Sequence, residues 1–190
     1  MAETSIDLGR PVQGDVIELI LDDHRRFETL LRDLRDSSSD RDAVRRALAT
    51  LHTAHAIAEE RHVYPRLERK RAISEEEAEH GEHEHAEGHE AMLAVLELKG
   101  TDTQAFEDAV EELAKLINHH LTEEELTILN PARDEVGEQA RAELGLAFLK
   151  ERNEQIDAGC GSVQQIRDLV AAARREGLID DSDEDSDEDE

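Results

Sequence analysis

A histidine followed four residues later by a glutamate occurs twice in this chain, as His55/Glu59 and as His120/Glu124. On an α-helix, side chains four residues apart lie one above the other, so both members of each pair can reach one point. An imidazole and a carboxylate that converge on one point form half of a binding shell for a transition metal. The two pairs therefore predict helices whose inner faces carry metal ligands.

Composition favours an all-α fold. The 190 residues suffice for one domain with appendages that buries its core without disulfides. Apolar residues make up 37% of the chain and aromatic residues only 2%, so the core must consist mainly of leucine, isoleucine, valine and alanine. Charged residues also make up 37% and β-branched runs are few, which favours a helical bundle.

Apolar residues recur at alternating steps of three and four along four segments, which predicts four helices that each bury one face. The segments run from Asp15 to about Asp36, from Asp40 to Arg69, from Ser74 to Gly100, and from Thr103 to about Pro131. Pro65 is expected to bend the second helix, and Ser74 with Glu77 forms a capping box that opens the third. Two further helical segments, at about 136–158 and 162–177, are expected to pack against the bundle.

Short connections make successive helices antiparallel neighbours, which predicts an up-down-up-down four-helix bundle. Residues at equal height in a helical hairpin lie symmetrically about its turn. By this criterion one layer of the bundle contains seven inward-facing residues: His24, His55, Glu59, His85, His89, His120 and Glu124. Burying these histidines and carboxylates together would cost several kcal/mol without compensation, and a metal cluster supplies that compensation.

Several other polar residues lie near this layer. His52 and His62 lie close to the direction of His55 on the second helix, so each is an alternative ligand or a hydrogen-bonding neighbour of the ligands. Tyr64, the only tyrosine, is expected to make a core or capping contact. Three histidines face away from the ligand rows: His80, His83 and His119.

The ligand types restrict the metal. Five imidazoles and two carboxylates without a thiolate exclude an iron–sulfur cluster and are too many for one tetrahedral zinc ion. They suit two metal ions, each carboxylate bridging both. A ferritin-like site would use Glu-x-x-His pairs, and Glu59/His62 and Glu82/His85 have that spacing. The inward residue of the first helix is His24 instead of a carboxylate, which favours the nitrogen-rich site.

These residues also carry a resemblance to a known family. The segments Leu21–Phe27 and His85–Met92, with the two His-Glu pairs, resemble the hemerythrin-like HHE cation-binding family of the bacterial type over about residues 15–130. The resemblance implies a non-haem centre of two iron ions, bridged by an oxo or hydroxo group, inside a four-helix bundle. By similarity Glu59 and Glu124 bridge the irons. His24 and His55 then bind one iron, and His85, His89 and His120 bind the other.

The expected function follows from that resemblance. One open iron position would bind O2, peroxide or nitric oxide, which leaves a carrier and an enzyme both open. The alternatives are a non-catalytic sensor or interaction protein that signals through the C-terminal extension, and ferritin-like storage of divalent metal. Oxygen-carrying hemerythrins have their last carboxylate one residue later than Glu124, where this chain has Glu125.

Charge and cysteine content restrict the partners and the compartment. The net charge of −27 argues against nonspecific binding to nucleic acid or to an anionic membrane. A lone cysteine, Cys160, and the lack of a long apolar run predict a soluble cytoplasmic protein. The acidic tail is expected to be disordered and solubilising, with docking to a basic protein partner as the alternative. The predicted divisions are a flexible arm at 1–14, the bundle at 15–132, a helical extension at 133–178 and the tail at 179–190.

Overall fold

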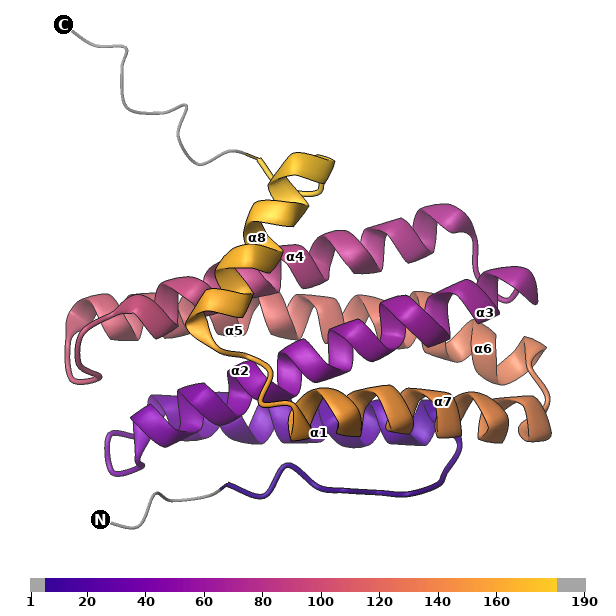
Figure 1. The fold of residues 1–190 in the computed structure, drawn as a ribbon, viewed down its shortest axis with the longest axis horizontal. Helices are drawn as coiled ribbons and strands as arrows, with labels where there is room; N and C mark the ends of the chain where they lie inside the picture. The colour runs from indigo at the N-terminus through magenta and orange to yellow at the C-terminus, as the bar shows by residue number, and fades with distance from the viewer. Residues whose placement is uncertain (1–5, 181–190) are drawn as a thin grey trace, which may run out of the picture.

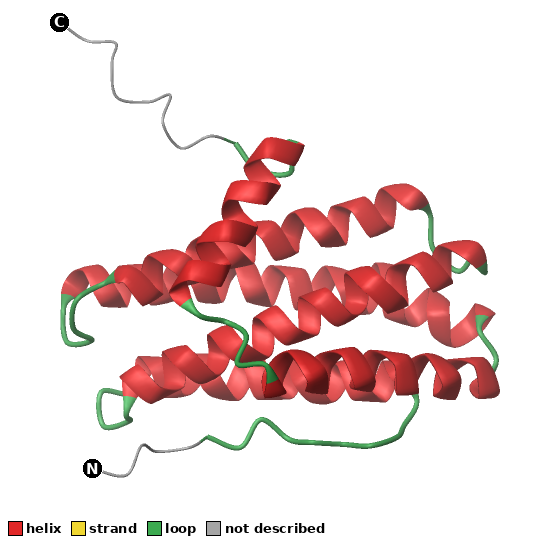
Figure 2. Cartoon of the chain, viewed as in Figure 1, coloured by secondary structure: helices red, strands yellow, loops and turns green. Residues whose placement is uncertain are grey.

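The computed structural model describes residues 6–180, and within that range the chain forms helices and loops without any strand (Figure 2). The α-helices are α1 (Val16–Arg35), α2 (Arg41–Ala58), α3 (Tyr64–Arg69), α4 (Glu75–Glu97), α5 (Gln104–Glu124), α6 (Asn130–Glu135), α7 (Glu138–Asp157) and α8 (Val163–Glu176). Two π-helical segments, η1 (Glu59–Val63) and η2 (Glu125–Leu129), join α2 to α3 and α5 to α6. The all-α prediction is confirmed. The acidic tail beyond residue 180 lies outside the described residues.

Four of the helices form two antiparallel hairpins, α1 with α2 and α4 with α5 (Figure 1). α1 also packs against α5, and α2 packs against α4, which closes the predicted four-helix bundle. The buried Arg41 at the start of α2 ties the connecting loops together at one end. Its guanidinium donates to the carbonyl oxygens of Arg35 and Thr101, at 2.9 and 2.8 Å.

The helices begin where side chains satisfy their first free N–H groups. The caps are Asp15 for α1, Asp40 for α2, Ser74 for α4 and Thr103 for α5. The capping box predicted at Ser74 and Glu77 is present, with both reciprocal hydrogen bonds. Each cap removes the cost of unpaired backbone donors at a helix end, which explains why the predicted starts agree with the observed ones.

The helix expected to end near Pro131 instead continues to Glu135. A proline inside a helix lacks an N–H donor and clashes with the carbonyl four residues earlier. The π-helical segment η2 widens the turn just before it, and the N–H of Asn130 bonds to the carbonyl of Glu125, five residues back. η1 performs the same task before Pro65, so the bend expected there takes the form of a π-helical turn.

The apolar core has two parts, one on each side of the predicted polar layer. One cluster includes Phe27, Leu48 and Phe106, and the other includes Ile20 and Phe148. On α1, His24 lies between Ile20 of one cluster and Phe27 of the other. The bundle is therefore apolar at both ends and polar in the middle, which shields the layer from water along the bundle axis.

The C-terminal extension packs against the bundle as expected. α7 lies along α1 and α2, and α8 crosses over α4 (Figure 1). Residues 6–14, expected to form a loose arm, contact α7, where the carbonyl oxygens of Leu8 and Gly9 accept hydrogen bonds from Arg152. Within residues 6–180, none of the helices combines the length and apolar character needed to span a bilayer.

The loop between α7 and α8 gives a prediction about stability. Gly161 has a φ of +81°, and a Cβ there would lie 2.6 Å from the backbone of Ala49 and Thr50. Gly159 has a φ of +74°, but a Cβ there meets nothing within 4 Å. We expect Gly159→Ala to cost about 1 kcal/mol of unfolding free energy through backbone strain alone. Gly161→Ala should cost about 1–3 kcal/mol more because the loop must move. Urea unfolding of both variants measures the difference, and equal losses would contradict the close packing of this loop on α2.

Candidate metal centre

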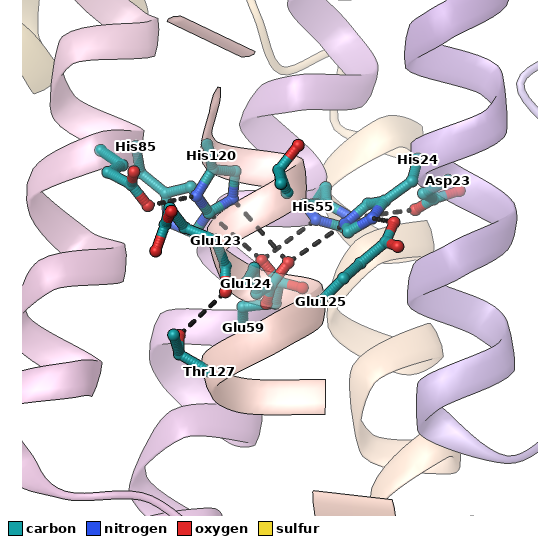
Figure 3. Close-up of polar contacts among 12 residues, drawn as sticks. Asp23, His24, His55, Glu59, His85, His120, Glu123, Glu124, Glu125 and Thr127 are labelled. Atoms are coloured by element: carbon teal, nitrogen blue, oxygen red, sulfur yellow. Dashed lines mark hydrogen bonds and ion pairs between the residues drawn. The ribbon is translucent and has the colours of Figure 1, made fainter. Parts of the chain in front are cut away.

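Six of the seven predicted ligands come together in the middle of the bundle, in two groups. One group is His24, His55 and Glu124, and the other is Glu59, His85 and His120. Within each group the ligand atoms lie within 4.8 Å of one another, and all six residues are buried. Figure 3 shows these side chains projecting into a common space, and they come from α1, α2, η1, α4 and α5. The structure therefore places one half of the layer on the α1–α2 hairpin side and the other on the α4–α5 side, with the glutamates between them.

The two glutamates each face both groups. The contacts between glutamate Oε2 and imidazole Nε2 atoms are Glu59–His55 at 3.1 Å, Glu59–His85 at 3.2 Å, Glu124–His24 at 3.1 Å and Glu124–His120 at 3.8 Å. A carboxylate in this position has an imidazole from each group within reach. This is the arrangement expected of carboxylates that bridge two metal ions.

Several of the candidate ligand atoms are buried without a hydrogen-bond partner. They are the Nε2 atoms of His55, His85 and His120 and both carboxylate oxygens of Glu59. The Nε2 atom of His89, the remaining predicted ligand, is also without a partner. Glu59 lies close to its two histidines, but neither of these short contacts has the geometry of a hydrogen bond. Buried polar atoms rarely remain unpaired, since the loss of hydration is costly. The donor set thus fits a metal cation, which would satisfy the atoms of the two groups at once.

The second ring nitrogen of every imidazole in the centre faces a carboxylate. The Nδ1 pairs are His24–Glu125 at 3.0 Å, His55–Asp23 at 3.3 Å, His85–Glu60 at 2.9 Å and His120–Glu84 at 3.0 Å. A carboxylate at Nδ1 keeps Nε2 directed into the centre and makes it a better electron donor. The contacts of these four carboxylates with the imidazoles were not predicted from the sequence.

These four carboxylates follow a repeat. An acidic residue immediately precedes His24 and His85, and a second glutamate immediately follows Glu59 and Glu124. In each hairpin the acid before the first histidine contacts the second histidine, and the extra glutamate contacts the first histidine of the other hairpin. The α1–α2 and α4–α5 hairpins therefore contribute equivalent sets of residues, related by an approximate two-fold axis through the centre.

The family comparison identifies the class of this domain. The sequence model of the hemerythrin HHE cation-binding domain matches residues 15–132. The chain belongs to the hemerythrin HHE cation-binding family. No curated protein and no solved structure matches the chain. The matched range contains all six grouped residues of the hemerythrin-like domain, whereas α7 and α8 lie beyond it.

Tyr64 breaks the two-fold symmetry of the hemerythrin-like centre. Its buried hydroxyl donates to Glu124 Oε1 at 3.2 Å, and its ring stacks on that of His85 with centroids 5.9 Å apart. Gly81 makes room for the phenol, because a Cβ there would lie 2.9 Å from the hydroxyl oxygen. Burial, reinforced by the charge of Glu124, raises the pKa of Tyr64 well above its usual value, so the phenol keeps its proton. Tyr64 thus makes a core contact, and its hydroxyl also orients a carboxylate of the centre.

His89 lies apart from both groups. Its ring packs edge-on against that of His52, with centroids 4.7 Å apart. Burial lowers the pKa of His89 to about 4 and that of His52 well below its usual value, so both rings are neutral. His62 contacts Glu151 on α7 at 3.2 Å, outside the centre. Of these histidines, His52 and His89 therefore form a buried neutral pair beside the hemerythrin-like centre.

Protons offset the negative charge of the metal-free centre. Burial alone would lower the pKa of His55, but the charges of Glu59 and Asp23 outweigh it and raise the pKa to about 9. Burial of His85 is likewise outweighed by Glu59 and Glu60, which raise its pKa to about 10. Burial favours protonation of Glu59, but the adjacent His55 prevails and lowers its pKa well below the usual value. Without metal, the centre therefore contains charged imidazoles around an ionised glutamate.

Proposed function

We propose that this chain is a non-haem di-iron protein that binds O2 or reacts with peroxide or nitric oxide. The single observation that supports this proposal best is the pair of buried His/Glu groups, in which the Nε2 atoms of three histidines and both oxygens of Glu59 have no hydrogen-bond partner. Imidazole and carboxylate ligands without thiolate suit iron in its two common oxidation states. When bound, the two irons would supply the electrons for small-ligand chemistry that the side chains cannot supply themselves.

Each half of the centre would bind one iron. His24 and His55 would bind the first and His85 and His120 the second, with Glu59 and Glu124 shared between them. Because His89 lies apart from the groups, the second iron would have fewer protein ligands than the resemblance implied. Positions not occupied by side chains are then available to an external ligand.

The surrounding residues would hold the centre dry and its ligands in place. The apolar clusters on both sides exclude water along the bundle axis. The Tyr64 hydroxyl donates a hydrogen bond to Glu124 Oε1. Four carboxylates hold the imidazole rings in place through their Nδ1 atoms. A fixed ligand set in a dry site lowers the reorganisation needed when a small molecule binds.

Metal content and the visible spectrum test this proposal. Protein purified aerobically from iron-replete cells is expected to contain about two irons per chain and to show near-ultraviolet charge-transfer bands. His120→Ala should lose the iron, whereas His62→Ala, a histidine outside the centre, should retain it. Zinc alone, or no metal in the wild-type chain, would contradict the proposal. A stoichiometry far above two would favour storage. Decay of added peroxide would favour an enzyme over a carrier.

The pKa values predict that metal binding releases protons. His55 and His85, with pKa values of about 9 and about 10, are protonated at neutral pH and must lose those protons to bind metal. We expect release of about two protons per chain at pH 7, so apparent affinity should fall about tenfold per proton for each pH unit below 9. Calorimetric titration in buffers of different ionisation enthalpy measures the protons. A heat that is the same in every buffer would show that these imidazoles are already neutral.

A sensor is the second candidate, and one observation favours it. Phe148 on α7 packs edge-on against the ring of His55, with centroids 5.7 Å apart. The extension beyond the matched domain therefore contacts a proposed ligand directly. A sensor would change the protease sensitivity of residues 133–180 between the metal-free and iron-loaded chain, and a carrier or enzyme with a rigid extension would not.

A further inference from the structure

Arg152 on α7 is a buried cation with a complete set of partners. It is only 1% exposed, and its guanidinium donates five hydrogen bonds. Two of these go to the two oxygens of Asp23, at 2.6 and 2.7 Å, and two go to the carbonyl oxygens of Leu8 and Gly9. The fifth goes to the side chain of Asn153. A buried charge held this completely is fixed in position, because every donor would be unpaired in another orientation.

Asp23 connects Arg152 to the metal centre. The oxygen Oδ2 of Asp23 accepts from Arg152 Nε at 2.6 Å and lies 3.3 Å from Nδ1 of His55. The carboxylate is itself buried, and its other charged neighbour, Arg26, is more distant, at 3.5 Å. The two hydrogen bonds from the Arg152 guanidinium therefore set the orientation of the Asp23 carboxylate that faces His55.

The other half of the centre shows what Arg152 adds. Glu84 occupies the position equivalent to Asp23 and contacts Nδ1 of His120. Its further neighbours are two exposed histidines, His80 and His119, at 3.6 and 3.5 Å. Among the described residues, Glu84 has no bidentate arginine. The fixed arrangement is thus specific to the His55 side, which α7 covers.

We propose that Arg152 is a positioning residue of the metal centre, which holds Asp23 so that His55 presents Nε2 to the metal. The inference rests on the proposed function, in that His55 is taken to bind metal. It assigns part of the site to α7, which lies outside the residues matched by the family, so the extension completes the centre as well as covering it. Phe148, one turn earlier on α7, restrains the same imidazole ring from its edge.

Metal titration of full-length variants tests this role. Cobalt(II), whose visible absorption reports its coordination, is titrated into metal-free wild-type, Arg152→Met, Asp23→Asn and the double variant. We expect Arg152→Met and Asp23→Asn each to lower the affinity for one of the two cobalt ions by about 10- to 100-fold. Because Arg152 acts through Asp23, the double variant should bind no more weakly than Asp23→Asn, within about twofold. Arg152→Lys keeps the positive charge but cannot donate two parallel hydrogen bonds to Asp23. Its cobalt affinity should lie between those of the wild type and Arg152→Met.

Arg141→Met is the matched control. Arg141 lies on the same helix and also pairs with an aspartate at the start of α1, Asp15, at 2.7 Å, but it does not contact the centre. It should lose thermal stability while binding both cobalt ions as the wild type does. If Arg152→Met does not fold, the cobalt spectrum of Arg152→Lys is compared with that of the wild type instead, and a shift is expected.

The outcomes separate this inference from the proposed function. A wild-type chain that binds no metal contradicts the proposed function. A wild-type chain that binds two ions, with Arg152→Met and Arg152→Lys identical to it in affinity and spectrum, overturns the role of Arg152. Additive losses in the double variant would also overturn it, because they would show that Arg152 and Asp23 act independently.

Discussion

Glu59→Gln is expected to abolish binding of both metals at once. Glu59 Oε2 lies between Nε2 of His55 and Nε2 of His85, one from each half, and neither of its oxygens has another partner. A glutamine is nearly the same size but carries no charge, and its amide would donate hydrogen bonds where a metal needs electron pairs. Iron content after anaerobic loading should fall from about two per chain to near zero, with loss of the near-ultraviolet bands.

Glu60→Gln is the matched control for this substitution. Glu60 is the next residue, and among the candidate ligands of the described range it contacts Nδ1 of His85, the ring nitrogen that faces away from the centre. Its loss should weaken binding by about 10- to 100-fold without changing the stoichiometry at saturating metal. If Glu59→Gln retained both irons, the shared position of Glu59 would have no role in binding, and the two halves would have to bind metal separately.

Iron is expected to raise the melting temperature of the metal-free protein by roughly 10 °C or more. A ligand that binds only the folded state at about 1,000 times its dissociation constant adds about 4 kcal/mol for each site. A chain of this size gains about 2–4 °C for each kcal/mol. The physical reason is that the metal satisfies the buried nitrogen and oxygen atoms that lack partners in the metal-free centre.

Thermal unfolding followed by circular dichroism, with and without ferrous iron under anaerobic conditions, measures this shift. His120→Ala should show little or none of it, whereas His62→Ala, outside the centre, should shift as the wild type does. An unchanged melting temperature in the wild-type chain would mean that the unpaired atoms in the layer do not bind iron.

Much of the fold and of the layer could be predicted from the sequence. Apolar residues spaced three and four apart identify the inward face of each helix. Residues equally far from a turn lie at the same level of the bundle, which places His24, His55 and His120 in one layer. The same rows placed His85 and His89 together, since residues four apart share a face. The spacing alone does not specify, however, which side chains each ring meets across the bundle. His85 meets Glu59 and His120, whereas His89 meets His52, one turn away.

Two other features could not be predicted from helical periodicity. The continuation of the helix through Pro131 depends on a π-helical turn, which shifts the register without leaving a pattern of its own. The contact between Asp23 and Arg152 joins residues 129 positions apart, and it depends on where α7 packs. An arginine in an amphipathic helix is usually exposed, so nothing in the pattern of α7 marked Arg152 as buried.

The approximate two-fold axis means that each helical hairpin carries half of the centre. α1–α2 contributes Asp23, His24, His55, Glu59 and Glu60, and α4–α5 contributes their counterparts. Two identical copies of a single hairpin, related by a true two-fold axis, would thus present the same ligands and the same carboxylates behind them. In a single chain, by contrast, the two halves can differ, as they do here where Tyr64 contacts Glu124 and Arg152 contacts Asp23.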